Sequence, residues 1–381
     1  MDNRFRTAAE IDLGAICANG QTARRLFPKQ KLLSVLKADA YGHGITGVVP
    51  AYETFTDWYA AATVEEGAKI RRQSEKPILL LGPVPDGRIV EAAENGLTFT
   101  VGSSEYGRRL SELLGKAGLT ADCHLKIDTG LNRSGIRWRE ENNAIAEIAA
   151  VRSLPNLRFT GTFTHFACGE GQTDWELAFT RQQFERFEAA CAEMERCGFA
   201  AGIRHCCSTG GSLVHPDYRL DMVRLGMLPL GMSYSDESVH ELGLIPAMRW
   251  VTRIAQTETV EAGECISYGC TYRATRQMRI AIVTCGYADG YHRCYSGKTS
   301  VLVCGKKVPT IGRIAMDYTV IDVTEVPEAA VGTEVTLLGC DGALTVSAQE
   351  ISELTGSVSG EVTCTVSERV PRVYRNKREE E

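Results

Sequence analysis

From residue 12 to about residue 243, short apolar runs alternate with longer amphipathic stretches. Runs of four to eight apolar or β-branched residues are typical of buried strands. The pattern predicts strands over residues 32–36, 58–63, 78–81, 97–101, 122–127, 158–163, 202–206 and 222–228. Strands that alternate with helices form parallel βα units. Eight such units favour a (β/α)8 barrel of the TIM type over an open sheet, so the predicted class is α/β.

The clearest helical pattern between these strands covers residues 174–197. Its apolar side chains recur at three- and four-residue steps, which places them on one face of a helix. They are Phe184, Phe187, Cys191 and Met194.

The pattern changes after residue 244. Runs rich in Val, Thr and Ile alternate with a period of two, glycines and prolines interrupt them, and long helical patterns stop. These features predict an all-β second domain over residues 244–381 after a barrel over residues 12–243. Residues 1–11 are too short to fold alone, and we expect them to add to the β-rich domain.

Size and charge agree with a two-domain enzyme. A chain of 381 residues exceeds the usual limit of one hydrophobic core. The net charge of −6 argues against nucleic acid or an anionic membrane as a partner. No apolar stretch reaches the length of a membrane helix, and the first residues lack the apolar core of a signal peptide. We therefore expect a cytoplasmic protein.

The 14 cysteines are scattered, several lie inside apolar runs, and none forms a CxxC pair. This distribution predicts buried, reduced thiols. The clusters CH (123–124), THFAC (165–168) and HCC (205–207) match none of the usual zinc spacings, so no metal site is expected.

The candidate chemistry begins with VLKADAYGHG, residues 35–44, where a lysine ends an apolar strand. Most lysines are simply solvated. In a barrel, however, the active site lies at the carboxyl ends of the strands. Lys37, His165 and Arg224 all fall at those ends, which makes them candidates for one site.

Seven further segments, together with VLKADAYGHG, give the chain a resemblance that covers nearly its whole length. They are HLKIDTGLNRSG (124–135), TFTHFA (162–167), MVRLG (222–226), ISYGCTY (266–272), GYADGYHR (286–293), IGRIAMD (311–317) and RVPRVY (369–374). In these segments, and in their order, the chain resembles the alanine racemases. The resemblance implies a pyridoxal 5'-phosphate barrel with a β-rich domain.

The resemblance implies that Lys37 forms the Schiff base with the cofactor, which requires a neutral amine. It places Arg224 against the pyridine nitrogen. Because a guanidinium only donates hydrogen bonds, that nitrogen stays unprotonated. Other implied cofactor contacts are Tyr41, Arg133, His165, Thr209, Gly226, Met227 and Tyr374.

Racemisation removes a proton from one face of the α-carbon and returns one to the other, so it needs two acid–base groups. By resemblance these are Lys37 and Tyr268, with Tyr268 supplied by the partner subunit of a homodimer. His165 matches the histidine that links this tyrosine to Arg224.

The substrate contacts are also implied by the resemblance. Arg133 and the backbone of Met316 match groups that bind the substrate carboxylate. Tyr268 is also implied as a substrate contact. Tyr287 and Asp317 match residues near the entrance of the shared site. Lys126 matches a lysine that many members carry as a carbamate.

Three alternatives to an alanine racemase that supplies D-alanine for peptidoglycan stay open. A serine or broad-range racemase differs by one substrate hydroxyl, which an apolar pocket rejects weakly. A related decarboxylase of basic amino acids would not need Tyr268 as a second base. A non-catalytic carrier of the cofactor would lack the β-rich domain.

Overall fold

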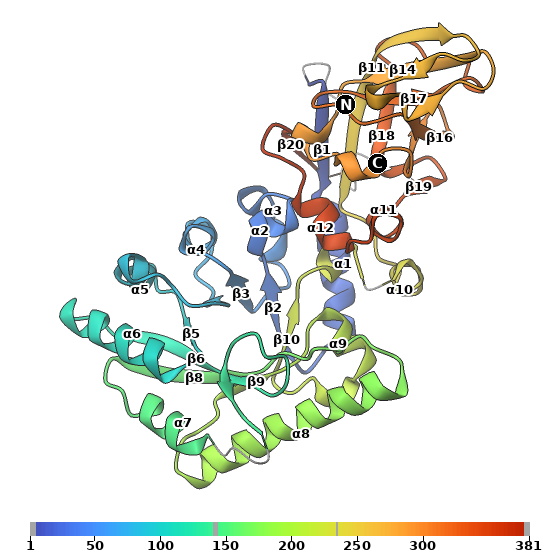
Figure 1. Ribbon diagram of the computed structural model, residues 1–381. Helices are drawn as coiled ribbons and strands as arrows, with labels where there is room; N and C mark the ends of the chain where they lie inside the picture. Colours follow the sequence, from blue (N-terminus) through green and yellow to red (C-terminus); the bar gives the residue numbers. More distant parts are fainter. Residues whose placement is uncertain (1–4, 140–143, 234, 377–381) are drawn as a thin grey trace. The chain divides into compact units, whose positions relative to one another are not determined.

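The computed structural model describes residues 5–139, 144–233 and 235–376 (Figure 1). The chain divides into two compact units. One, which we call the α/β unit, comprises residues 19–38 and 48–229. The other, the β-rich unit, comprises residues 1–18, 39–47 and 230–381. The segment 39–47 thus belongs to the β-rich unit although residues of the α/β unit flank it on both sides.

The α/β unit contains all eight predicted strands, which confirms the prediction for each of them. They are β2 (Lys31–Val35), β3 (Trp58–Ala61), β4 (Ile78–Leu80), β5 (Phe99–Val101), β6 (Ala121–Asp128), β8 (Leu157–Phe163), β9 (Ile203–His205) and β10 (Met222–Leu225). The short β7 (Ile136–Arg137) pairs with β6. The eight strands form two parallel sheets in the orders β10-β2-β3-β4 and β5-β6-β8-β9.

Backbone hydrogen bonds join these two sheets at both edges. At one edge, the N–H of Leu80 donates to the carbonyl of Thr98, just before β5. At the other, the N–H of Arg224 in β10 donates to the carbonyl of Cys207, just after β9. Hydrogen bonds thus connect β4 with the segment before β5, and β10 with the segment after β9.

Helices lie between the strands of this unit, as the alternation predicted. They are α4 (Val64–Arg71), α5 (Ile89–Glu94), α6 (Ser104–Lys116), α7 (Ile145–Arg152), α8 (Asp174–Arg196) and α9 (Thr209–Val214), while α1 (Leu13–Leu26) and α3 (Ile45–Tyr52) extend from the β-rich unit. The helix predicted over 174–197 is α8, and a capping box of Thr173 and Glu176 starts it. Its predicted apolar face is buried at Phe187, Cys191 and Met194.

The β-rich unit is built on a nine-stranded sheet in the order β19-β18-β15-β16-β17-β14-β11-β1-β20. These strands are β1 (Thr7–Asp12), β11 (Met248–Val260), β14 (Met278–Val283), β15 (Ser300–Val303), β16 (Lys306–Ile311), β17 (Thr319–Asp322), β18 (Glu334–Asp341), β19 (Leu344–Val346) and β20 (Arg372–Arg375). A separate hairpin pairs β12 (Cys265–Ile266) with β13 (Tyr272–Arg273). The first strand, β1, lies between β11 and β20.

The expectation of an all-β second domain is wrong for residues 348–364, which form α11 (Ala348–Thr355) and α12 (Ser359–Cys364). A further short helix, α10 (Asp236–Glu241), precedes the sheet strands. Ser347 caps α11 by accepting a hydrogen bond from the N–H of Glu350. Each helix has eight residues or fewer, too short for a helical period to stand out from the strand patterns around it.

The prediction of buried thiols holds for only part of the set. All 14 cysteines are free, but six of them are exposed. The buried ones are Cys123, Cys191, Cys206, Cys207 and Cys285. Across residues 5–139, 144–233 and 235–376, no group of three or more His, Cys, Asp or Glu side chains lies where it could hold a metal ion. In the same ranges no helix is both long and apolar enough to span a membrane.

Candidate active site

Lys37 follows strand β2 and is the first residue of α2 (Lys37–Tyr41), and it is exposed. This turn is left-handed, because the four residues from Ala38 to Tyr41 have φ angles between 51° and 58°. Left-handed geometry costs roughly 1–2 kcal/mol for each residue that has a Cβ. Only an over-determined surrounding structure keeps such a turn in place.

Hydrogen bonds from the following residues hold the turn. The buried His43 imidazole places Nδ1 3.1 Å from the Ala40 carbonyl and 3.0 Å from that of Tyr41. Burial lowers the pKa of His43 to about 4, so the neutral ring donates from Nδ1. The carboxylate of Asp39 accepts from the N–H of Ile45 at 3.1 Å. The Tyr374 hydroxyl donates to the His43 carbonyl at 3.2 Å.

Arg224 lies in β10 and is only 5% exposed. Its Nη2 group faces three acceptors within 2.9 Å: the carbonyls of Thr164 and Cys206 and the Nδ1 atom of His165. Burial lowers its pKa to about 10, so it stays protonated at neutral pH. No acceptor for its Nε–H is found among the described residues, which leaves this donor available to a ligand.

The contact with Arg224 fixes the protonation of His165. A guanidinium has no acceptor, so the His165 Nδ1 atom, 2.8 Å from Nη2, must accept. The ring is therefore neutral, with its proton on Nε2. Burial and the charges of Arg224, Arg133, Lys126 and Lys37 lower the His165 pKa to about 2. These charges also show that the predicted lysines and arginines gather around this ring.

Two further buried histidines continue the same network. The Nδ1 atom of His205 lies 3.0 Å from Nη1 of Arg224, and its Nε2 atom lies 2.9 Å from Nδ1 of His124. In the sequence these rings fall in the clusters HCC and CH, whose spacings do not predict a zinc site. The hydrogen bond between them is not predictable from the sequence, because partners on parallel strands are far apart along the chain and no local pattern encodes the strand register.

Lys126 lies in β6 and donates from Nζ to the Ser134 hydroxyl at 2.6 Å. Burial and the positive charges of Arg133 and Arg224 lower the Lys126 pKa to about 8, so part of the population is neutral at pH 7–8. The Asp128 carboxylate accepts from the N–H of Gly130 at 2.9 Å and so shapes the loop that carries the exposed Arg133.

Thr209 and Gly226 meet at the ends of β9 and β10. The Gly226 N–H lies 3.3 Å from the Thr209 hydroxyl, and both residues are buried. Met227 follows at once and is half-buried. A hydroxyl beside backbone N–H groups is a donor set that suits an anion.

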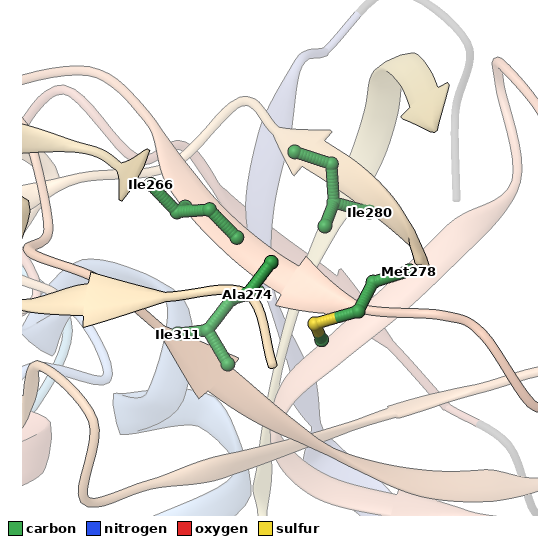
Figure 2. Close-up of a cluster of buried hydrophobic side chains, with 5 residues drawn as sticks. All are labelled: Ile266, Ala274, Met278, Ile280 and Ile311. Atoms are coloured by element: carbon green, nitrogen blue, oxygen red, sulfur yellow. The ribbon is translucent and has the colours of Figure 1, made fainter. Parts of the chain in front are cut away.

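In the β-rich unit, Tyr268 stands at the tip of the β12–β13 hairpin and is 67% exposed. Positive φ angles at Ser267, Gly269 and Cys270 turn the chain there. A buried apolar cluster supports the hairpin (Figure 2). Its members are Ile266, Ala274, Met278, Ile280 and Ile311.

The other residues predicted from the second domain lie on neighbouring loops of this unit. Met316 is 53% exposed, and its carbonyl accepts from the N–H of Ala288 at 3.0 Å. Gly286 packs so closely that a Cβ there would lie 2.5 Å from the Met316 carbonyl oxygen. Tyr287 follows it and is also exposed, whereas Asp317 is paired with Arg369 at 2.7 Å.

The predicted site residues thus fall into two sets. The α/β unit contains Lys37, Lys126, Arg133, His165, Thr209, Arg224, Gly226 and Met227. The β-rich unit contains Tyr41, Tyr268, Tyr287, Met316, Asp317 and Tyr374.

The whole chain, including both sets of residues, is similar to known proteins. Residues 11–233 match the N-terminal domain of alanine racemase, and residues 247–374 match its C-terminal domain. An alanine racemase of Symbiobacterium thermophilum is 37% identical over 376 residues, which cover 98% of each chain.

Solved structures give the same result. The alanine racemase of Clostridium difficile 630 superposes with a TM-score of 0.89 at 34% identity, covering 98% of this chain and 96% of that one. That of Bacillus anthracis with bound L-Ala-P has a TM-score of 0.88 at 32% identity, over 97% and 95% of the two chains. The chain belongs to the alanine racemase family.

Proposed function

We propose that this chain interconverts L- and D-alanine with pyridoxal 5'-phosphate, in a homodimer whose two active sites are each built from both subunits. The observation that carries the proposal is the buried Arg224, whose Nε–H has no acceptor among the described residues, and whose partner His165 also feels the positive charge of Lys37. We further propose that the ring of eight parallel strands is a closed (β/α)8 barrel, because hydrogen bonds join its two sheets at both edges.

The residues of the α/β unit fit this cofactor. Lys37 offers a primary amine at the carboxyl end of a strand, where barrel enzymes carry their chemistry. The Thr209 hydroxyl and the N–H groups at Gly226 and Met227 suit a phosphate. The Nε–H of Arg224 suits an unprotonated ring nitrogen. Tyr41 and Tyr374 would add hydroxyl contacts to the phosphate. When bound, pyridoxal phosphate withdraws electrons from the α-carbon of an amino acid and makes its proton acidic.

Two groups would then move the α-proton. Lys37 serves one face of the substrate, and Tyr268 of the partner subunit serves the other. His165 carries its proton on Nε2 and would donate a hydrogen bond to the phenolate form of that tyrosine, which lowers the cost of removing the phenolic proton. The high exposure of Tyr268 in the single chain agrees with a side chain that completes a site elsewhere.

Substrate binding would use charge and backbone groups from both subunits. Arg133 supplies a guanidinium that fits a carboxylate with two hydrogen bonds. The backbone N–H of the partner's Met316 would bind the same carboxylate, with Tyr287 and Asp317 at the entrance. Lys126 has a low enough pKa to be partly neutral, and a neutral amine reacts with carbon dioxide. We therefore propose a carbamate at Lys126 that orients Arg133.

The test is a racemisation assay with L- and D-alanine in separate reactions, read with an enzyme specific for one enantiomer. L- and D-serine are run beside them. Conversion of alanine in both directions at well above the serine rate supports the proposal. Equal rates would make the chain a broad-range racemase, and release of carbon dioxide from lysine or ornithine would make it a decarboxylase. An alanine racemase would supply D-alanine for peptidoglycan, and we propose that it acts in the cytoplasm.

The cofactor lysine can be identified without an activity measurement. Borohydride reduction of the loaded protein fixes the cofactor on its lysine, and mass spectrometry of the peptides locates it. We expect the label on Lys37 and none in Lys37→Ala. Lys31→Ala is the matched control, because Lys31 is exposed at the opposite end of the same strand.

A further inference from the structure

Two buried histidines, His205 and His124, follow Arg224 in a row of hydrogen bonds on the side away from His165's contact with Arg224, and neither is assigned a chemical step. All three side chains are buried, with exposures of 0%, 0% and 5%. The atom distances along the chain are 2.9 Å and 3.0 Å, so each link is a hydrogen bond. Polar groups this deep in a protein are costly unless they are ordered and paired.

The direction of every link follows from Arg224. Its Nη1 must donate, so Nδ1 of His205 accepts, and the His205 proton lies on Nε2. That proton is donated to Nδ1 of His124, whose own proton must then lie on Nε2. One permanent cation therefore sets both tautomers and keeps both rings neutral.

At the His124 end of this row of hydrogen bonds, the imidazole ring is held by packing. No hydrogen-bond partner is found for Nε2 of His124 in the described part of the chain. The ring lies 5.1 Å from the ring of Trp58, and a Cβ at Gly161 would come within 2.6 Å of it. The His205 ring is stacked on Phe163 at 4.7 Å and 5°. Neither ring can turn to offer its other nitrogen without a change in this packing.

The hydrogen bonds of Arg224 also determine which of its N–H groups remain available to a ligand. Carbonyl oxygens and His165 occupy Nη2, and His205 occupies one hydrogen of Nη1. The acceptors lie on both sides of the guanidinium and hold its plane. Nε–H takes no part in these contacts and remains available to a ligand.

We propose that His205, supported by His124, is a positioning residue that fixes the guanidinium plane of Arg224 and thereby the hydrogen bond to the cofactor's ring nitrogen. The inference rests on the proposed function, which places Arg224 against that nitrogen. A rotated Arg224 would let the nitrogen gain a proton from water. The ring would then draw electrons more strongly, and a larger share of turnovers would end in transamination.

The kinetic test compares two substitutions at one position. His205→Asn keeps an acceptor near the place of Nδ1, whereas His205→Leu removes it. We expect His205→Leu to lower kcat about ten- to a hundredfold, the cost of a small misplacement of a reacting group. The KM for alanine should change less, and pyruvate formed per racemisation should rise. His205→Asn should restore most of kcat and the parental product ratio. Trp58→Phe alters the packing on His124 but no hydrogen bond of the chain, so it should resemble the parent.

A second readout needs neither substrate nor cofactor. In protein labelled with ¹⁵N-histidine, the imidazole shifts should show His124, His165 and His205 as neutral rings protonated on Nε2. A charged ring, or a proton on Nδ1 of His205, would overturn the chain. If His205→Leu fails to fold, the comparison moves to His124. His124→Asn keeps the acceptor for His205 and should match the parent, whereas His124→Leu should raise the pyruvate share.

The outcomes separate this inference from the proposed function. A parent protein without racemase activity rejects the proposed function, and this positioning role with it, even when the tautomers are as expected. An active parent whose folded His205→Leu variant keeps its kcat and product ratio rejects the positioning role alone. Equal loss of kcat in His205→Leu and His205→Asn, with an unchanged pyruvate share, would show that His205 only packs.

Discussion

At the scale of single residues, the site is organised by one buried cation. Arg224 is permanently charged and can only donate hydrogen bonds. The nitrogen of His165 or His205 that faces it must therefore accept, so the proton of each ring lies on its other nitrogen. Burial lowers the pKa of four histidines and keeps them neutral, so each of them would have to gain a charge in acid. They are His43, His124, His165 and His205.

This neutrality predicts how stability depends on pH. Burial lowers the pKa of His124 to about 4, whereas in the unfolded chain it returns to about 6.5. Between these values the unfolded state binds more protons, so the stabilisation is fully present above pH 6.5 and is lost as the pH falls toward 4. Each such histidine contributes a slope of up to about 1.4 kcal/mol per pH unit.

His124→Asn isolates one of these contributions, because it keeps an acceptor for His205 but cannot titrate. We expect the free energy of unfolding in urea to fall less steeply between pH 6.5 and pH 4.5 than in the parent. The difference in slope should be about one proton. His240→Asn, at an exposed position, serves as the control. Parallel curves for parent and His124→Asn would contradict the assigned burial effect.

At the scale of elements, the β12–β13 hairpin shows how the fold places a side chain that is largely exposed. Tyr268 is exposed, and the apolar cluster beneath the hairpin supplies its support (Figure 2). Ile266 and Ile311 lead directly into the loops that carry Tyr268 and Met316. Packing in this cluster therefore sets the position of two proposed active-site groups at once.

Truncation in the cluster should reduce activity at a distance. Met278→Ala removes a buried side chain and should cost roughly 2–5 kcal/mol of stability. Because the hairpin loses its support, kcat should fall while the spectrum of the bound cofactor stays unchanged. Met278→Leu conserves volume and should cost below about 1.5 kcal/mol. A folded Met278→Ala protein with the parental kcat would show that the cluster does not position Tyr268.

The elements also show what one sequence can predict. All eight strands of the α/β unit were predicted, because buried parallel strands are continuous apolar runs bounded by turns. The helices at 348–364 were missed, since six- and eight-residue segments contain barely two turns of periodicity. The site residues came from motif resemblance. The partners of His205 did not, because they depend on a register between strands that no local pattern encodes.

At the scale of the whole molecule, the proposed groups for the two faces of the substrate belong to different units of the chain. Lys37 lies in the α/β unit and Tyr268 in the β-rich unit. The proposed function therefore requires a two-fold dimer, which presents the same pair of surfaces twice.

Mixed dimers test this arrangement. Lys37→Ala and Tyr268→Phe should each be nearly inactive, because each lacks one proton carrier. Refolded together at equal amounts, about half the dimers are mixed, and each of these has one complete site of two, so roughly a quarter of the parental activity should return. Mixed dimers shown to be present by mass, yet inactive, would refute the shared site.

The left-handed turn after Lys37 has a consequence for chirality. Residues 38–41 hold L-amino acids in the backbone conformation that their mirror images prefer. A semisynthetic chain with D-alanine at the exposed position 38 should therefore unfold at a higher temperature than the natural one, by the equivalent of about 1 kcal/mol. D-alanine at position 189, exposed in the right-handed helix α8, should have the opposite effect. A lower melting temperature for the chain with D-alanine at 38 would mean that the turn is not strained. The segment that carries the proposed catalytic lysine thus has a backbone conformation that D-residues would adopt more easily than the L-residues it contains.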